Sequence, residues 1–183
     1  MNGSSVRRIV ITGGPGSGKT TLIKRLESRG HKVFHEVSRE ITKRARQEGV
    51  DQLFLKDPLL FSLELLAART QQFTQASNWK DKMVYYDRGL PDIPSYLDYL
   101  GCAYPSEFYE ACLAHQYHTI FLLPPWEAIY HQDEERYESF ETAKAIYGYL
   151  RNGYRKFGYV VHELPTGEVD ERIDHLIDIL DRS

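Results

Sequence analysis

Short apolar runs alternate with longer amphipathic stretches along almost the whole chain. The apolar runs are rich in β-branched and aromatic residues and predict strands at 6–12, 31–35, 83–86, 118–123 and 159–164. Apolar residues recur at helical spacing between these runs and predict helices at 19–29, 38–47, 58–77, 91–100, 106–115, 142–157 and 169–180. Strands and helices therefore follow one another in regular alternation.

Turn-forming residues mark the ends of several elements. Gly30 follows the first helix and is typical of a helix C-terminus, whereas Asp57 and Pro58 are suited to be the N-cap and first residue of the long helix. Strands joined by helical crossovers require a mainly parallel sheet covered on both faces. The sequence therefore predicts an α/β three-layer sandwich with five strands. We expect a single domain, residues 1–183, because the chain contains no repeat and no linker.

Composition narrows the class of protein. The chain has 183 residues, of which 42% are hydrophobic and 27% charged, as in ordinary globular domains. Its net charge of −3 gives no support to a nucleic-acid-binding surface. The two cysteines are too few for a disulfide framework, and no run is long and apolar enough for a membrane span or a signal peptide. We expect a cytoplasmic protein.

The stretch "GGPGSGKT" matches the phosphate-binding pattern G-x-x-x-x-G-K-[ST] in full and has a predicted strand before it and a predicted helix after it. Its glycines let backbone N–H groups curl around an anion, and Lys19 is placed to reach the β- and γ-phosphates. The Thr20 hydroxyl is a candidate ligand of Mg²⁺. The predicted nucleotide-binding residues are Gly13, Gly14, Pro15, Gly16, Ser17, Gly18, Lys19, Thr20 and Thr21. We therefore expect this P-loop to bind a nucleoside triphosphate with magnesium.

Two carboxylates follow strands that should end at the ligand-binding edge of the sheet. Asp87 ends the third predicted strand and is a candidate magnesium ligand; the alternative, an N-cap, is weakened because the next helix begins only near Pro91. Glu36 follows the second strand. It is a candidate base for an attacking hydroxyl, or else an acid that favours the dipole of the helix beginning at Ser38.

Arginines accompany these acids. Arg88 is a candidate contact for phosphate or substrate, or a salt-bridge partner of Asp87 or Asp92. Arg136 lies in a charged stretch after the fourth strand, in a region of about 127–141 that we expect to be a lid. The charged stretch is equally typical of a solvated helix. The insert between the second and third strands offers further partners for a polar acceptor: Arg39, Arg44, Arg69 and Gln72.

Taken together, the P-loop and the stretches "EVSREI", "YYDRGLPDIPSYLDYLG" and "DEERYESFETAKAI" resemble a family of P-loop ATPases and kinases, often described as AAA-like, that includes the kinase domain of bacterial nicotinamide-riboside kinases. The resemblance covers nearly the whole chain. A wider similarity extends to nucleoside and nucleotide kinases. It implies a P-loop NTPase fold with a kinase-like lid, Glu36 as base, Arg88 as substrate contact and Arg136 as lid arginine.

Two functions are consistent with these features. The first is a kinase that transfers the γ-phosphoryl group of ATP to a hydroxyl of a small nucleoside-like acceptor. The second is a slow NTPase that serves as a nucleotide-gated binding or regulatory protein. The chain departs from deoxynucleoside kinases, which have Glu-Arg-Ser where it has Asp87-Arg88-Gly89, so the resemblance does not identify the acceptor. It also lacks the Asn-Lys-x-Asp guanine signature, which leaves ATP as the expected nucleotide.

Overall fold

A computed structural model describes residues 6–79, 83–130 and 139–182, and the statements below concern these residues. Their core is a five-stranded sheet in which every pair of neighbouring strands is parallel. In spatial order the strands are β2 (Lys32–Phe34), β3 (Met83–Asp87), β1 (Arg7–Gly13), β4 (Thr119–Leu123) and β5 (Val161–Glu163). The predicted α/β class and the parallel sheet are confirmed.

The helices follow the predicted order. They are α1 (Lys19–Ser28), α2 (Ser38–Gln47), α3 (Leu53–Lys56), α4 (Pro58–Ala76), α5 (Asp92–Leu100), α6 (Glu107–Ala114), α7 (Phe140–Lys156) and α8 (Val169–Asp181), with a 3₁₀ turn at Glu127–Ile129. The Asp57 side chain accepts a hydrogen bond from the Leu60 N–H at 2.9 Å, which confirms it as the N-cap of α4. The sequence pattern missed only the short α3 and the 3₁₀ turn.

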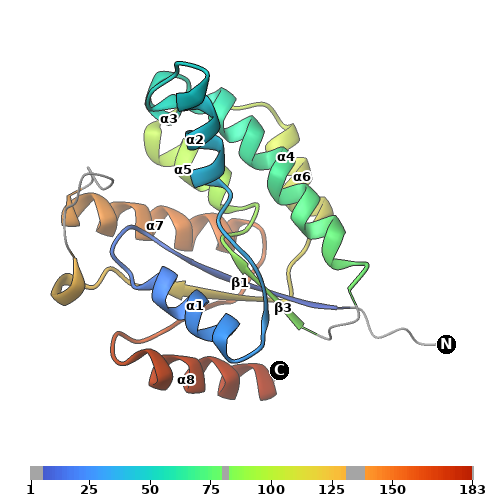
Figure 1. Cartoon of the computed structure of the whole chain (residues 1–183), viewed down its shortest axis with the longest axis vertical. Coiled ribbons are helices and arrows are strands. Elements are labelled where there is room, and N and C mark those ends of the chain that lie inside the picture. Colours follow the sequence, from blue (N-terminus) through green and yellow to red (C-terminus); the bar gives the residue numbers. More distant parts are fainter. Residues whose placement is uncertain (1–5, 80–82, 131–138, 183) are drawn as a thin grey trace.

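Helices cover both faces of the sheet (Figure 1). Helices α1 and α8 pack on one face, against alternate strand residues that include Ile9, Ile11 and Phe121. The intervening residues, such as Val10 and Ile120, face the other layer, to which α2, α4, α5, α6 and α7 belong. Burial on both faces explains the continuous apolar runs Ile9–Ile11 in β1 and Ile120–Leu123 in β4, since every side chain of such a run contacts a helix layer.

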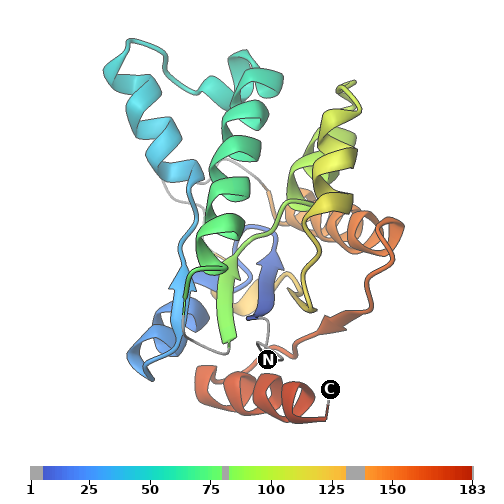
Figure 2. The ribbon, with the colours of Figure 1, turned by 90° about the vertical axis from the view of Figure 1, so that its right-hand side faces the viewer.

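Within this second layer, helices α2 and α4 rise well above the sheet (Figure 2). Helix α2 begins just after β2, and helix α4 ends just before β3, the neighbour of β2 in the sheet. Helix α5 packs beside α7. A pocket lined by residues of α2, α4 and α5 lies over the carboxyl ends of β2, β3 and β1. These neighbouring strands therefore deliver the predicted site residues to one place. None of the described helices is long and apolar enough to cross a membrane.

Candidate active site

The loop between β1 and α1 has the backbone geometry of a phosphate cradle. Gly16 and Gly18 have φ angles of 68° and 77°, which favour glycine. A Cβ on Gly16 would lie 2.3 Å from Cδ2 of Tyr130, so the site also lacks space for a side chain. Ser17 is buried, and its hydroxyl donates a hydrogen bond to the Gly14 carbonyl at 2.9 Å. Helix α1 begins directly after the loop and directs its N-terminus toward it.

The sheet register brings the predicted acidic residues to this loop. Phe34 of β2 pairs with Tyr86 of β3, so Glu36 and Arg88 leave the sheet at the same level. Asp87 pairs with Ile11 of β1, two residues before the loop begins at Gly13. The convergence expected from strand ends is therefore present in the fold, although the functional roles of these residues stay predictions.

Lys19 and Asp87 form an ion pair, with Nζ 3.0 Å from Oδ1, and both side chains are about nine-tenths buried. Apart from this contact with Nζ, Oδ1 is buried and has no hydrogen-bond partner among the described residues. Because α5 begins only at Asp92, Asp87 is not a helix N-cap. The Asp87 carboxylate and the exposed Thr20 both line one pocket, and oxygen atoms of carboxylates and hydroxyls are the ligands that a hard cation such as Mg²⁺ prefers. These residues fit the expected metal.

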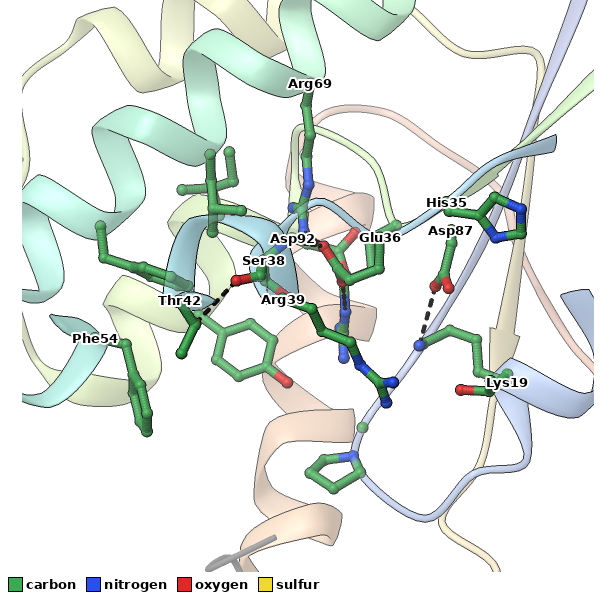
Figure 3. A pocket seen from close by; sticks show the side chains of 18 of the residues that line it. Lys19, His35, Glu36, Ser38, Arg39, Thr42, Phe54, Arg69, Asp87 and Asp92 are labelled. Atoms are coloured by element: carbon green, nitrogen blue, oxygen red, sulfur yellow. Dashed lines mark hydrogen bonds and ion pairs between the residues drawn. The ribbon is translucent and has the colours of Figure 1, made fainter. Parts of the chain in front are cut away.

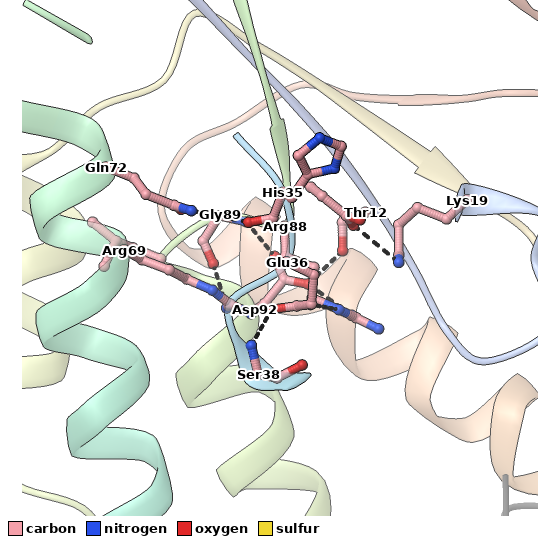
Figure 4. A network of polar contacts seen from close by, with 12 residues as sticks. Thr12, Lys19, His35, Glu36, Ser38, Arg69, Gln72, Arg88, Gly89 and Asp92 are labelled. Atoms are coloured by element: carbon pink, nitrogen blue, oxygen red, sulfur yellow. Dashed lines mark hydrogen bonds and ion pairs between the residues drawn. The ribbon is translucent and has the colours of Figure 1, made fainter. Parts of the chain in front are cut away.

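Glu36 lies between two arginines (Figure 4). Its Oε1 is 2.9 Å from a terminal nitrogen of Arg69, and its Oε2 is 2.5 Å from Nε of Arg88. Burial opposes ionisation, but the charges of Arg69, Arg88 and Lys19 prevail and lower the pKa of Glu36 to about 2. Oε1 also accepts a hydrogen bond from the Ser38 N–H at 3.2 Å, so the helix-start role exists beside the pocket-facing one.

Asp92 organises the turn that follows β3. It is only 1% exposed, and Oδ1 accepts hydrogen bonds from the Thr12 hydroxyl at 2.5 Å and from Arg88 at 3.2 Å. Oδ2 accepts from the Gly89 N–H at 2.9 Å and from the Tyr154 hydroxyl. Arg88 itself has a φ of 73°, a strained value for a residue with a side chain. The Asp92 network holds this conformation and aims Arg88 at Glu36.

The sequence alone does not predict several of the contacts that hold these site residues in place. Arg69, expected to contact an acceptor, is 4% exposed and instead holds Glu36 and the Gly89 carbonyl. The sequence indicates Asp92 only as a salt-bridge partner of Arg88, because its link to Tyr154 spans 62 positions and no local pattern signals it. Arg172 of α8 donates to the Ser17 carbonyl at 3.3 Å and supports the loop from behind. The only sequence signal for this role is that Arg172 occupies a position on the apolar face of the amphipathic helix α8.

A pocket of about 1200 Å³ joins these parts (Figure 3). One end is the phosphate loop with Lys19, Asp87 and Glu36. The other end lies between α2, α4 and α5 and combines polar with apolar side chains: Ser38, Arg39, Thr42, Phe54, Phe61, Ser62, Leu65 and Tyr96. The Arg39 side chain extends from α2 across the pocket toward the phosphate loop (Figure 3).

Other predicted residues lie elsewhere. Arg44 pairs with Glu64 in a separate groove between α2 and α4, and Gln72 of that groove donates to the His35 carbonyl at 2.9 Å, so neither lines the main pocket. Arg136 and most of the expected lid, residues 131–138, lie outside the described residues. Within the described part of the chain, no group of three or more His, Cys, Asp or Glu side chains is arranged to hold a metal.

Comparisons place this geometry among known proteins. A family model described as an AAA domain matches residues 8–172. Deoxyadenosine kinase from M. mycoides, with dCMP and dCDP bound, has a similar structure: TM-score 0.69, 18% identity, 96% of this chain and 100% of that chain covered. The NadR protein in complex with NAD and AMP-PNP has a TM-score of 0.69 and 19% identity, and the match covers 97% of this chain and 49% of that chain. Thymidylate kinase from Ehrlichia chaffeensis has a TM-score of 0.66 and 16% identity, and the match covers 96% of this chain and 99% of that chain.

At these identities the solved structures establish a shared fold, that of P-loop kinases. Together with the family match they confirm the resemblance inferred from the sequence. The chain corresponds to about half of the NadR protein's length. A search of curated proteins found no match.

Proposed function

The chain belongs to the AAA domain family, and we propose that it is a phosphotransferase that moves the γ-phosphoryl group of Mg-ATP to a hydroxyl of a small nucleoside-like acceptor. The observation that supports this most is a single pocket of about 1200 Å³ that contains both the phosphate loop and a second wall built by α2, α4 and α5. A pure nucleotide switch has no need of that second space. Glu36 lies at the phosphate-loop end, two residues before α2, which forms part of the second wall.

In the proposed reaction the acceptor oxygen forms a bond to the γ-phosphorus as the bond to the bridging oxygen of ADP breaks. ADP leaves with that electron pair, and the hydroxyl proton passes to a Glu36 oxygen and then to solvent. With a pKa of about 2, Glu36 is a weak base, so the proton moves only as the new bond forms. Lys19, Arg88 and the loop N–H groups stabilise the charge on the transferred group.

Magnesium, held by Thr20 and Asp87, would neutralise part of the phosphate charge and orient the triphosphate. In the free protein Lys19 neutralises Asp87 instead, at 3.0 Å. Nucleotide binding therefore requires Lys19 to exchange a carboxylate for phosphate oxygens. The ion pair keeps both groups in place and neutral overall until the ligand arrives.

Lys19→Ala should weaken Mg-ATP binding or lower turnover by about 100-fold or more, because it removes the cation that faces the β- and γ-phosphates. The measurement is equilibrium binding of Mg-ATP together with steady-state ADP formation. Arg25→Ala is the matched control, since Arg25 lies on the same helix but pairs with Asp170 at the surface. Normal binding and turnover in Lys19→Ala would refute the phosphate-site assignment.

Glu36→Gln should leave Mg-ATP affinity nearly intact and lower phosphoryl transfer by about 10²–10⁴-fold, if Glu36 accepts the proton. Glu36→Asp keeps the charge, so it should fold like the parent and isolate the effect of carboxylate position. Rates are measured in a single turnover at pH 5 to 9, after circular dichroism has verified folding. Because the pKa of Glu36 is about 2, no change of rate in this range arises from Glu36 itself. An unchanged transfer rate would show that Glu36 is not the base and acts only at the start of α2.

The competing function, a slow NTPase that gates a binding partner, predicts that no small acceptor accelerates ADP formation. A panel of nucleosides, nucleotides and other hydroxyl compounds separates the two functions. Strong acceleration by one compound, with its phosphorylated product identified by mass spectrometry, supports the kinase. Slow hydrolysis that is independent of every compound supports the gated protein.

A further inference from the structure

The pocket is far more positive than the protein around it. Seven lysine or arginine side chains but only three carboxylates line it, although the chain as a whole has a net charge of −3. The three carboxylates, Glu36, Asp87 and Asp92, lie at the phosphate-loop end, and each pairs there with a lysine or arginine. Four lysine or arginine side chains remain outside these pairs, of which Lys24 lies on α1 and the other three on α2.

Much of this excess lies on one face of α2. Arg39, Lys43 and Arg46 are spaced four and three residues apart, which places them on one side of a helix, and all three line the pocket. They are exposed, and they form no hydrogen bond or ion pair with any residue in 6–79, 83–130 or 139–182. Arg44, on another side of α2, instead pairs with Glu64.

The position of these cations along α2 separates them from the nucleotide phosphates. Helix α2 starts next to Glu36 and runs away from the sheet (Figure 1). At 1.5 Å per residue, Lys43 lies about 6 Å and Arg46 about 10 Å farther along the helix than Arg39. Arg39 can therefore serve the transferred phosphoryl group, whereas Lys43 and Arg46 flank the far end of the pocket.

An apolar wall accompanies this basic face. Phe54, Phe61 and Leu65 line the same pocket from α3 and α4 and are partly or fully buried. Unpaired like charges three or four residues apart destabilise a helix, so the basic face lowers the stability of the free protein. An anion bound there would reverse that effect, while the apolar wall would bury a ring.

We propose that the acceptor is an anion: a compound with an apolar or aromatic ring and a phosphate or carboxylate group of its own, which Lys43 and Arg46 bind. The inference rests on the proposed function and specifies its substrate class. It assigns the reacting hydroxyl to the Glu36 end and the acceptor's charge to the α2 end. The enzyme would discriminate against neutral nucleosides, because they leave Lys43 and Arg46 without a counter-charge.

Equilibrium binding to the full chain saturated with Mg-AMP-PNP tests this inference without turnover. The probes are nucleosides, each compared with its 5′-monophosphate and its 5′-carboxylate. The anionic members should bind at least about tenfold more tightly, the gain expected from one or two charge-assisted contacts. The phosphate and carboxylate arms then identify the anion that Lys43 and Arg46 prefer.

The double variant Lys43→Gln/Arg46→Gln should lose this preference, whereas the control Arg44→Gln, on the same helix, should keep it. Equal binding of neutral and anionic probes, including no binding by either, would overturn the inference. A preference retained in the double variant would overturn it too. So would a parallel loss of Mg-AMP-PNP affinity, which would assign these cations to the triphosphate.

The two proposals can fail separately. A neutral nucleoside that the double variant phosphorylates as well as the parent does would leave phosphotransfer standing and refute the anionic acceptor. An anionic probe that binds through Lys43 and Arg46 but is never phosphorylated would support the anion site and count against the kinase.

Discussion

Glu36 is ionised in the folded protein over a wider pH range than in the unfolded chain. Its pKa falls from the usual 4.5 to about 2, since Arg69, Arg88 and Lys19 outweigh the effect of burial. A group whose pKa is lowered on folding stabilises the native state above its unfolded pKa and ceases to do so as the pH falls through the folded value. The contribution of Glu36 is therefore complete above pH 4.5 and lost toward pH 2.

The Glu36→Gln substitution should follow from this linkage. At pH 7 it removes the carboxylate that pairs with the buried Arg69 and Arg88, although Arg88 keeps Asp92 as a partner. Loss of this buried pairing should lower the free energy of unfolding by about 3–5 kcal/mol. The difference from the parent should shrink as the pH drops from 4.5 toward 2, because the parent's carboxylate becomes protonated. Urea unfolding at a series of pH values measures this difference in the free energy of unfolding. The control is Glu141→Gln, since Glu141 forms an exposed ion pair with Lys144. A difference that does not vary with pH would contradict the linkage.

Residues at strand ends were predictable, whereas the residues that hold them were not. Lys19, Glu36 and Asp87 follow from one motif and from the rule that ligands gather at the carboxyl ends of parallel strands. Asp92 draws its partners Thr12 and Tyr154 from distant parts of the chain, so its role depends on tertiary packing. The sequence predicts Arg69 as a contact for the acceptor, because its actual partner, Glu36, lies 33 positions away and gives no local signal.

Helices α5 and α7 pack tightly against each other beside the pocket. Ser95 of α5 packs against Gly153 of α7 so tightly that a Cβ on Gly153 would lie 1.9 Å from the serine hydroxyl oxygen. This contact fixes α5, and with it Asp92 at the start of that helix, relative to Tyr154 of α7. The packing of the two helices therefore supports the turn that carries Arg88.

Gly153→Ala should destabilise the protein by about 1–3 kcal/mol through overpacking, although alanine favours helix formation by about 1 kcal/mol. Gly148→Ala provides the comparison, since Gly148 lies in α7 with no atom near its missing Cβ. That substitution should be neutral or stabilising. Thermal unfolding of both variants measures the effect, and equal stability of the two would show that α5 and α7 have room to separate.

Element order was predictable because helix and strand periodicities are strong in this chain. The shortfalls have physical causes. Strands β2 and β5 are three residues long and lie at the two edges of the sheet, where each pairs on one side, so fewer backbone hydrogen bonds hold the residues that flank them in the strand conformation. Helix α3 is a single turn whose N-cap, Gln52, has a positive φ, and a turn of that length carries no periodic signal.

At the scale of the whole molecule, the strand order places three carboxyl ends side by side and leaves a pocket over them. The sequence predicted the strands and their parallel arrangement, and general rules predicted the edge where ligands gather. The depth and charge of the pocket could not be predicted, since they depend on how α2, α4 and α5 are placed. The single-domain organisation, the lid with Arg136, the bound magnesium and the cytoplasmic location stay predictions.

The destination of the γ-phosphoryl group tests the central claim most directly. ATP labelled at the γ-phosphate is mixed with excess protein, Mg²⁺ and the panel of neutral and anionic hydroxyl compounds, and the label is followed through a single turnover. Transfer to a hydroxyl predicts that, for one class of compound, most of the label appears in a phosphorylated acceptor and the rate rises. Label found only in free phosphate, at a rate that no compound changes, would contradict the phosphotransferase and favour a slow NTPase.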